Sequence, residues 1–218
     1  MHILGFARSC FLTIETARIK REQNMKVCIC GGTNPATNPK FFAVAQRMGE
    51  LLVENDFEMV WGGNAFGVLS HVHKMYMEKQ AKNTLVLPEA YKDDLKQMKT
   101  EENKTVHKTK EVSARTVTMF RMTNAVVCIP GGIGTIYEFW SAVEYKRAEE
   151  FDIDIIMLNF DGFYKHQLAH FDFINANGFT KIGAGGAPYK IAPEDLFHVC
   201  NTPEEVITLL KKIQKKRQ

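Results

Sequence analysis

From Met25 onward, short apolar runs alternate with longer amphipathic stretches, and this alternation constrains the fold more than any other feature of the sequence. Short apolar runs bounded by turn residues are typical of buried strands, whereas apolar residues every three or four positions are typical of helices. Strands that alternate with helices form parallel sheets covered by helices. The sequence therefore predicts an α/β fold: a single Rossmann-like domain with a doubly wound, mostly parallel sheet flanked by helices.

The pattern predicts five strands and six helices. The strands are expected at residues 27–30, 58–61, 84–87, 125–129 and 153–158. The helices are expected at about 39–55, from 67 onward, and at about 112–123, 135–149, 163–175 and 203–216. Residues 89–110 show no periodicity and are rich in Lys, Asp, Glu and Thr. We expect a long irregular segment there, and loops of that length are commonly functional.

The first 24 residues are expected to lie outside the folded domain. Met25 opens the first strong strand pattern, so residues 1–24 are interpreted as a poorly ordered extension or a non-native start, and residues 25–218 as the domain. The segment lacks the uninterrupted apolar stretch of a secretory signal, and Glu15 and Glu22 argue against a transit peptide. We therefore expect a cytoplasmic protein.

Charge and hydropathy exclude two classes of partner. The 28 Lys and Arg residues exceed the 25 Asp and Glu residues by three, and five of the cations lie within residues 211–218. The rest of the chain is close to neutral, whereas nucleic-acid-binding domains carry a basic face. No apolar run reaches the ~18 residues of a membrane-spanning helix. The sequence thus predicts neither a nucleic-acid partner nor a membrane partner.

Cysteine and histidine spacing gives no sign of a metal site. The five cysteines match no zinc-ligand pattern, and three of them lie in apolar runs, which indicates buried, reduced thiols. His166 and His170 are one helical turn apart but lack the glutamate of an H-E-x-x-H motif. We therefore expect neither a metal nor another cofactor.

Three glycine-rich turns follow predicted strands. They begin at Gly31, Gly62 and Pro130. In an open α/β sheet, ligands bind outside the carboxyl ends of the strands, and glycine amides at a helix start favour an anion. None of the turns matches a dinucleotide fingerprint or a P-loop. We expect a phosphate to be bound by Gly131, Gly132, Gly134, Thr135, Gly32, Thr33, Gly62 and Gly63.

Two charged residues near these turns have alternative interpretations. Thr135 and Glu138 have the spacing of a capping box, in which the glutamate satisfies a helix amide and does no chemistry. Arg115 lies on an otherwise apolar helical stripe with Met119 and Met122. It either binds a carboxylate or phosphate at the sheet edge, or packs its stem and reaches the surface.

The motifs at these positions resemble those of a known family. Residues 130–138, PGGIGTIYE, resemble the PGGxGTxxE motif of the Lonely Guy family, the cytokinin riboside 5′-monophosphate phosphoribohydrolases once mislabelled lysine decarboxylases. Arg115 and Met119 resemble its R-K-x-x-M segment, with Thr116 in place of lysine. Residues 62–69 look like its GGGxxGLM turn, with Asn64 for the third glycine, and residues 159–164 are similar to its NVDGYY segment.

The resemblance implies hydrolysis of the N-glycosidic bond of a nucleoside 5′-monophosphate, with AMP or an N6-modified AMP as the expected substrate. It implies that Glu138 and Arg115 are the catalytic pair, and it places Met119, Asn64 and Glu89 beside the base and ribose. A fixed carboxylate suits this chemistry because breaking the bond to C1′ builds positive charge on the sugar. Family membership also implies a homodimer or a higher homo-oligomer.

Three other functions stay open at this point. Related pyrimidine nucleotide hydrolases that act on CMP share the motif architecture. Molybdenum cofactor carrier proteins look like the same fold with a comparable glycine loop, and they bind a phosphorylated pterin without cleaving it. A structural or interaction protein could also retain the fold, because fold does not determine function.

Overall fold

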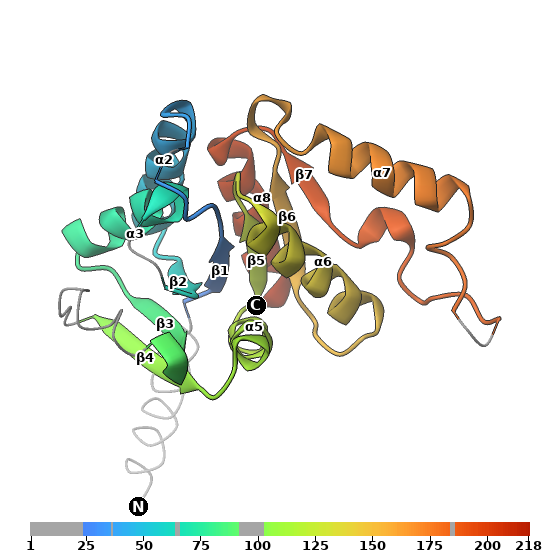
Figure 1. Ribbon diagram of the computed structural model, residues 1–218, viewed down its shortest axis with the longest axis horizontal. Coiled ribbons are helices and arrows are strands. Elements are labelled where there is room, and N and C mark those ends of the chain that lie inside the picture. Colours follow the sequence, from blue (N-terminus) through green and yellow to red (C-terminus); the bar gives the residue numbers. More distant parts are fainter. Residues whose placement is uncertain (1–23, 36, 64–65, 92–102, 184–185) are drawn as a thin grey trace, which may run out of the picture.

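The computed structural model describes residues 24–35, 37–63, 66–91, 103–183 and 186–218. These residues form a seven-stranded parallel sheet with helices on both faces (Figure 1). The strands are β1 (Lys26–Cys30), β2 (Glu58–Trp61), β3 (Asn83–Pro88), β4 (Lys104–Thr109), β5 (Ala125–Cys128), β6 (Asp154–Leu158) and β7 (His198–Cys200). The helices are α2 (Lys40–Glu54), α3 (Gly67–Glu78), α5 (Val112–Arg121), α6 (Ile133–Arg147), α7 (Lys165–Ala176) and α8 (Pro203–Arg217). Three short 3₁₀ helices are η1 (Glu89–Tyr91), η2 (Phe160–Gly162) and η3 (Pro193–Asp195).

The strand order places a topological switch point in the middle of the sheet. The order is β4-β3-β2-β1-β5-β6-β7, and every neighbouring pair is parallel. The chain moves outward from β1 to β4 and then returns to the other side of β1, where Cys30 pairs with Cys128. In such sheets, ligands bind where the strand order reverses. The loops after β1 and β5 are therefore the expected binding site.

Two apolar layers cover the sheet. Side chains alternate between the faces of a strand, so that Val27 and Ile29 pack in the layer formed with α2, α3 and α8. Cys28 and Cys30 lie in the opposite layer, where α5, α6 and α7 contribute buried side chains. Both faces are thus buried, as expected for a doubly wound parallel sheet.

The predicted fold class is confirmed, but two strands were missed. Residues 89–110 were expected to be irregular, whereas they contain η1 and β4. Strand β4 has the sequence KTVHKT, and its side chains are exposed or half-buried. It lies at the edge of the sheet, where no apolar alternation is required, so its pattern gave no strand signal. Strand β7 has only three residues, which is too short to produce a detectable pattern.

The remaining predicted elements agree with the structure to within a few residues. Helix α6 begins at Ile133 rather than at Thr135, a difference that matters for the site. The predicted extension at 1–24 lies almost entirely outside the described residues, and the domain boundary at Met25 stays a prediction. No helix within the described part of the chain has the length and apolar character needed to span a bilayer.

Candidate functional site

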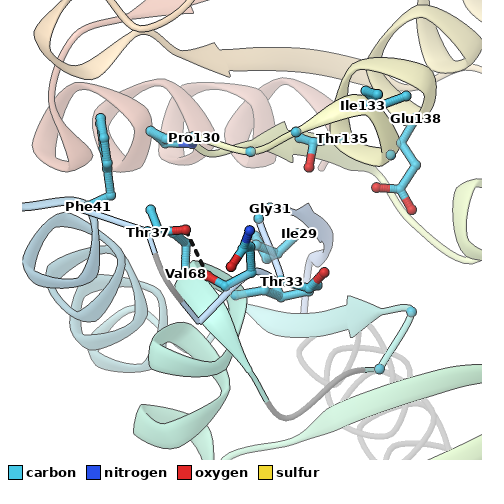
Figure 2. Close-up of a pocket in the computed structure, with 18 of the residues that line it drawn as sticks. Ile29, Gly31, Thr33, Thr37, Phe41, Val68, Pro130, Ile133, Thr135 and Glu138 are labelled. Atoms are coloured by element: carbon cyan, nitrogen blue, oxygen red, sulfur yellow. Dashed lines mark hydrogen bonds between the residues drawn. The ribbon is translucent and has the colours of Figure 1, made fainter. Parts of the chain in front are cut away.

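A cavity of about 600 Å³ lies at the carboxyl ends of the central strands (Figure 2). It is bordered by the turns that follow β1, β2 and β5 and by the end of β3. Ten of the thirteen predicted site residues line it: Glu138, Arg115, Gly131, Gly132, Gly134, Thr135, Gly32, Thr33, Gly62 and Gly63. The structure therefore brings together groups that are separated by about a hundred residues in the sequence.

The glycines of the β1 turn allow the neighbouring loops to pack backbone against backbone. The Gly32 amide donates to the Pro130 carbonyl at 3.1 Å, and the Gly32 carbonyl accepts from the Leu69 amide at 3.0 Å. Gly67 has a φ of +69°, and a Cβ at this position would lie 2.4 Å from the Thr33 carbonyl carbon. These contacts connect the loops after β1 and β5 to the start of α3. The Gly32 amide is engaged within the protein, so this glycine shapes the cavity through its packing.

The start of α6 borders the cavity with backbone that no side chain caps. Gly132 is the N-cap of α6 and has no capping side chain. A Cβ at Gly132 or Gly134 would meet no atom within 4 Å, so the backbone is open on this side. The Thr135 hydroxyl is directed into the space between the two loops (Figure 2). Free amides at the start of a 15-residue helix favour a phosphate.

Arg115 and Glu138 form a partly buried pair beside this helix start. Arg115 Nη2 lies 3.7 Å from Glu138 Oε1, and the two side chains are 24% and 13% exposed. Arg115 Nη1 also donates to the Gly62 carbonyl at 3.4 Å. The capping-box interpretation of Glu138 is wrong, because α6 begins two residues before Thr135 and Glu138 is its sixth residue. The carboxyl group faces Arg115 and the cavity instead.

Burial changes the protonation of Glu138. Loss of solvation raises the pKa of Glu138 to about 9; the negative charge of an ionised Cys30 acts in the same direction, and Arg115 opposes the shift. A carboxyl group with this pKa is protonated at neutral pH. The fixed negative charge expected from the sequence is therefore replaced by a neutral carboxyl group, which can donate a proton.

This protonation makes a prediction for stability. Between the ordinary pKa of glutamate and about 9, the folded protein holds a proton that the unfolded chain releases. Stability therefore falls as pH rises through this window. Glu138→Gln removes this pH-dependent loss of stability. The melting temperature of the variant minus that of the parent should therefore increase from pH 5 to pH 9. Glu150→Gln, at an exposed site, is the control. A constant difference across this range would show that Glu138 is already ionised.

Comparison with known proteins identifies the family. The family described as "possible lysine decarboxylase" matches residues 69–210, which include α5, α6 and both residues of the pair. The chain belongs to this family. The cavity, the glycine turns and the Arg115–Glu138 pair are thus features of a family member.

Curated relatives of this family member are named after one activity. The probable cytokinin riboside 5′-monophosphate phosphoribohydrolase LOGL1 of Oryza sativa subsp. japonica is 29% identical over 160 residues, which cover 72% of this chain and 69% of the relative. The phosphoribohydrolase LOG5 of Arabidopsis thaliana is 23% identical over 163 residues, which cover 75% and 71% of the two chains.

Solved structures with the same fold include binding proteins. The molybdenum cofactor carrier protein of Chlamydomonas reinhardtii has a TM-score of 0.62 and 18% identity, with 89% of this chain and 99% of that chain covered. The molybdenum cofactor binding protein of Rippkaea orientalis has a TM-score of 0.63, with 88% and 98% covered. At 18% identity these similarities show the shared fold alone.

The other predicted site residues lie away from the cavity wall or outside the described residues. Met119 is 1% exposed and packs in the core below α5. Glu89 lies in η1 and is exposed, while its neighbour Tyr91 lines the cavity. Asn64 lies outside the described residues. Thr116, which replaces the lysine of the resembled motif, is 1% exposed and therefore does not present a polar group to the cavity.

Sequence reasoning missed the apolar walls of the cavity. These are formed by Ile29, Val68, Leu69, Leu87, Phe41 and Phe163. Leu87 could have been found from its place at the end of a predicted strand, and Phe163 from the segment that resembles NVDGYY. Phe41 has the spacing of an ordinary apolar helix residue, so nothing in the sequence distinguishes it.

Three thiols lie close to Glu138. Cys28, Cys30 and Cys128 are buried and unoxidised, and the Sγ atoms of Cys28 and Cys30 are 3.7 Å apart. Hydrogen bonding to Cys30 and burial raise the pKa of Cys28 and of Cys128, whereas hydrogen bonds from Cys128 and Cys28 lower the pKa of Cys30. The expectation of buried, reduced thiols is confirmed for these three. These three side chains contribute to the burial that removes water from the Glu138 carboxyl group.

Proposed function

We propose that this protein hydrolyses the N-glycosidic bond of a nucleoside 5′-monophosphate, with AMP or an N6-modified AMP as substrate. The products are the free base and ribose 5-phosphate. The observation that carries the proposal is the partly buried Glu138, which lies 3.7 Å from Arg115 on the helix whose start can bind phosphate. The names of the curated relatives support the same activity.

The proposed reaction depends on where the 5′-phosphate and C1′ of the substrate lie. With the 5′-phosphate at the α6 start, C1′ lies near Glu138, within the second turn of the same helix. As the C1′–N bond breaks, its electron pair stays on the base, and Glu138 donates its proton to the departing base. The resulting carboxylate stabilises the positive charge on the sugar. Water then attacks C1′ and returns a proton to Glu138, which restores the starting state.

Arg115 orients the substrate and stabilises the ionised form of Glu138. Its guanidinium group is held between the Gly62 carbonyl and the Glu138 carboxyl group, and it has further donors for the base or ribose. As Glu138 gives up its proton, the positive charge of Arg115 stabilises the new carboxylate. We further propose that the protein acts in the cytoplasm as a homodimer or a higher homo-oligomer.

A substrate panel tests the proposal. The purified protein is incubated with AMP, N6-prenylated AMP, GMP, CMP and the matching nucleosides, and free base and ribose 5-phosphate are measured by chromatography. Release from a monophosphate but not from its nucleoside is expected, because phosphate binding positions C1′. Preferential release from CMP would indicate a pyrimidine hydrolase. Tight binding without release from any substrate would contradict the enzymatic proposal and favour a carrier.

A further inference from the structure

The cavity extends past the groups that a nucleoside monophosphate needs. Figure 2 shows Glu138 at one end, the loop from Pro130 to Thr135 in the middle, and Phe41 at the opposite end. The proposed function, with the phosphate at the α6 start and C1′ near Glu138, directs the base away from Phe41 and toward the part of the cavity lined by Gly62 and Leu87. The end of the cavity that contains Phe41 is then left empty by a monophosphate.

The width of the cavity supports this division. Its lining runs from Leu87, at the end of β3, to Phe163, which follows β6. In the sheet order these strands are four steps apart, so their ends are separated by about 19 Å at ~4.8 Å between neighbouring strands, and Phe163 lies in the turn after β6, against Phe41. The switch point between β1 and β5 lies within this span and holds the phosphate-binding loop. A ligand that fills the cavity therefore continues on both sides of its phosphate.

The empty end is a partly exposed aromatic surface. The rings of Phe41 and Phe163 meet edge to face with their centroids 5.2 Å apart, and Phe160 contacts Phe41 at 6.3 Å. Phe163 is 37% exposed, although both rings line the cavity. Aromatic faces of this kind bind planar bases by stacking.

Contacts between α2 and η2 hold the aromatic rings in place. Lys40, the first residue of α2, pairs with Asp161 in η2, and its ammonium group also lies 5.0 Å from the centre of the Phe41 ring. The pair fixes the start of α2 against the turn that carries Phe163. The two elements that carry the aromatic rings are thus linked at the surface of the protein by an ion pair.

We propose that the physiological substrate carries a second nucleoside on its 5′-phosphate through a pyrophosphate link, and that the base of this second nucleoside stacks against Phe41 and Phe163. The inference rests on the proposed function for the direction in which the substrate lies. The reaction is the same hydrolysis at C1′: water replaces the base near Glu138, and the product is a ribose that keeps the pyrophosphate and the second nucleoside. A nucleoside monophosphate is then the minimal substrate.

Binding to a catalytically inactive variant tests the proposal. In Glu138→Gln, the affinities for AMP and for P1,P2-di(adenosine-5′) pyrophosphate are measured by calorimetry. The pyrophosphate-linked ligand should bind at least about tenfold more tightly, which is the contribution of one stacked base. Phe41→Ala in the same background should remove this advantage, so that the two ligands bind with similar affinities. Phe173→Ala, at an exposed phenylalanine on α7 that does not line the cavity, is the matched control.

Other results would overturn the inference. Equal affinity for the two ligands would show that the aromatic end holds no second nucleoside, and absence of binding for both ligands would overturn this inference together with the proposed function. Weaker binding of both ligands to Phe41→Ala would place the substrate base itself at the aromatic end. If Phe41→Ala does not fold, Phe163→Leu gives the same comparison. Because binding is measured without turnover, failure of the proposed hydrolysis would appear separately in the substrate panel.

Discussion

Glu138→Gln is expected to reduce base release by roughly a hundredfold to ten-thousandfold, the range of general acid catalysis, and to leave the fold and AMP affinity in place. Glutamine has the shape of a protonated glutamic acid and keeps a donor toward the cavity. It cannot give a proton to the departing base, and it cannot become the carboxylate that stabilises positive charge on C1′. The measurement is kcat with saturating AMP, together with the dissociation constant of AMP.

A variant on the same helix provides the control for this loss. Glu144 lies on α6, is 59% exposed and pairs with Arg147. Glu144→Gln should retain full turnover. Near-normal turnover in Glu138→Gln would show that the carboxyl group has a structural role and that the proton comes from elsewhere. Loss of AMP binding in Glu138→Gln would assign the residue to substrate binding.

The pH dependence provides a second test of the same residue. A protonated Glu138 is required for proton donation, and the pKa of Glu138 in the ligand-free protein is about 9. In the parent protein, kcat/KM should therefore fall as pH rises through about 9, since this parameter reports the free enzyme. A fall already near the ordinary pKa of glutamate would mean that substrate meets an ionised carboxylate.

The strands and the place of the site were predictable because their signals are local. Apolar runs such as residues 125–129 are buried on both faces of the sheet, so their sequences show almost no polar residues. Because the carboxyl ends of parallel strands lie at the same edge of a sheet, the turns at Gly31, Gly62 and Pro130 were expected to lie together there, where ligands bind. This rule was sufficient to predict the eight turn residues that line the cavity, and the family resemblance added Arg115 and Glu138.

The properties that depend on distant neighbours were not predictable. The capping-box interpretation failed because spacing alone does not show that α6 begins at Ile133. The pKa of Glu138 depends on burial against Cys30, which lies on a different strand. Phe41 contacts Phe163 because the segment after β6 lies beside α2. The residue pattern of α2 alone does not indicate this contact.

Gly131→Ala is expected to destabilise the protein by about 2–4 kcal/mol, in the range of severe steric substitutions, and to lower the melting temperature by roughly 5–15 °C. A Cβ at this position would lie 2.2 Å from Thr135 Oγ1 and 2.7 Å from the Gly32 amide nitrogen. Gly32 cannot move away without loss of its hydrogen bond to Pro130. Thermal or urea unfolding measures the effect.

Gly134→Ala is the matched control, three residues further along the same loop and helix. A Cβ there meets no atom within 4 Å, and the residue lies within α6, where alanine is favoured over glycine. This variant should be as stable as the parent or more stable by up to about 1 kcal/mol. Equal melting temperatures for the two variants would show that the β1 and β5 loops are not in backbone contact. The loop proposed to bind phosphate would then be free to move, and its amides would not be preorganised for a 5′-phosphate.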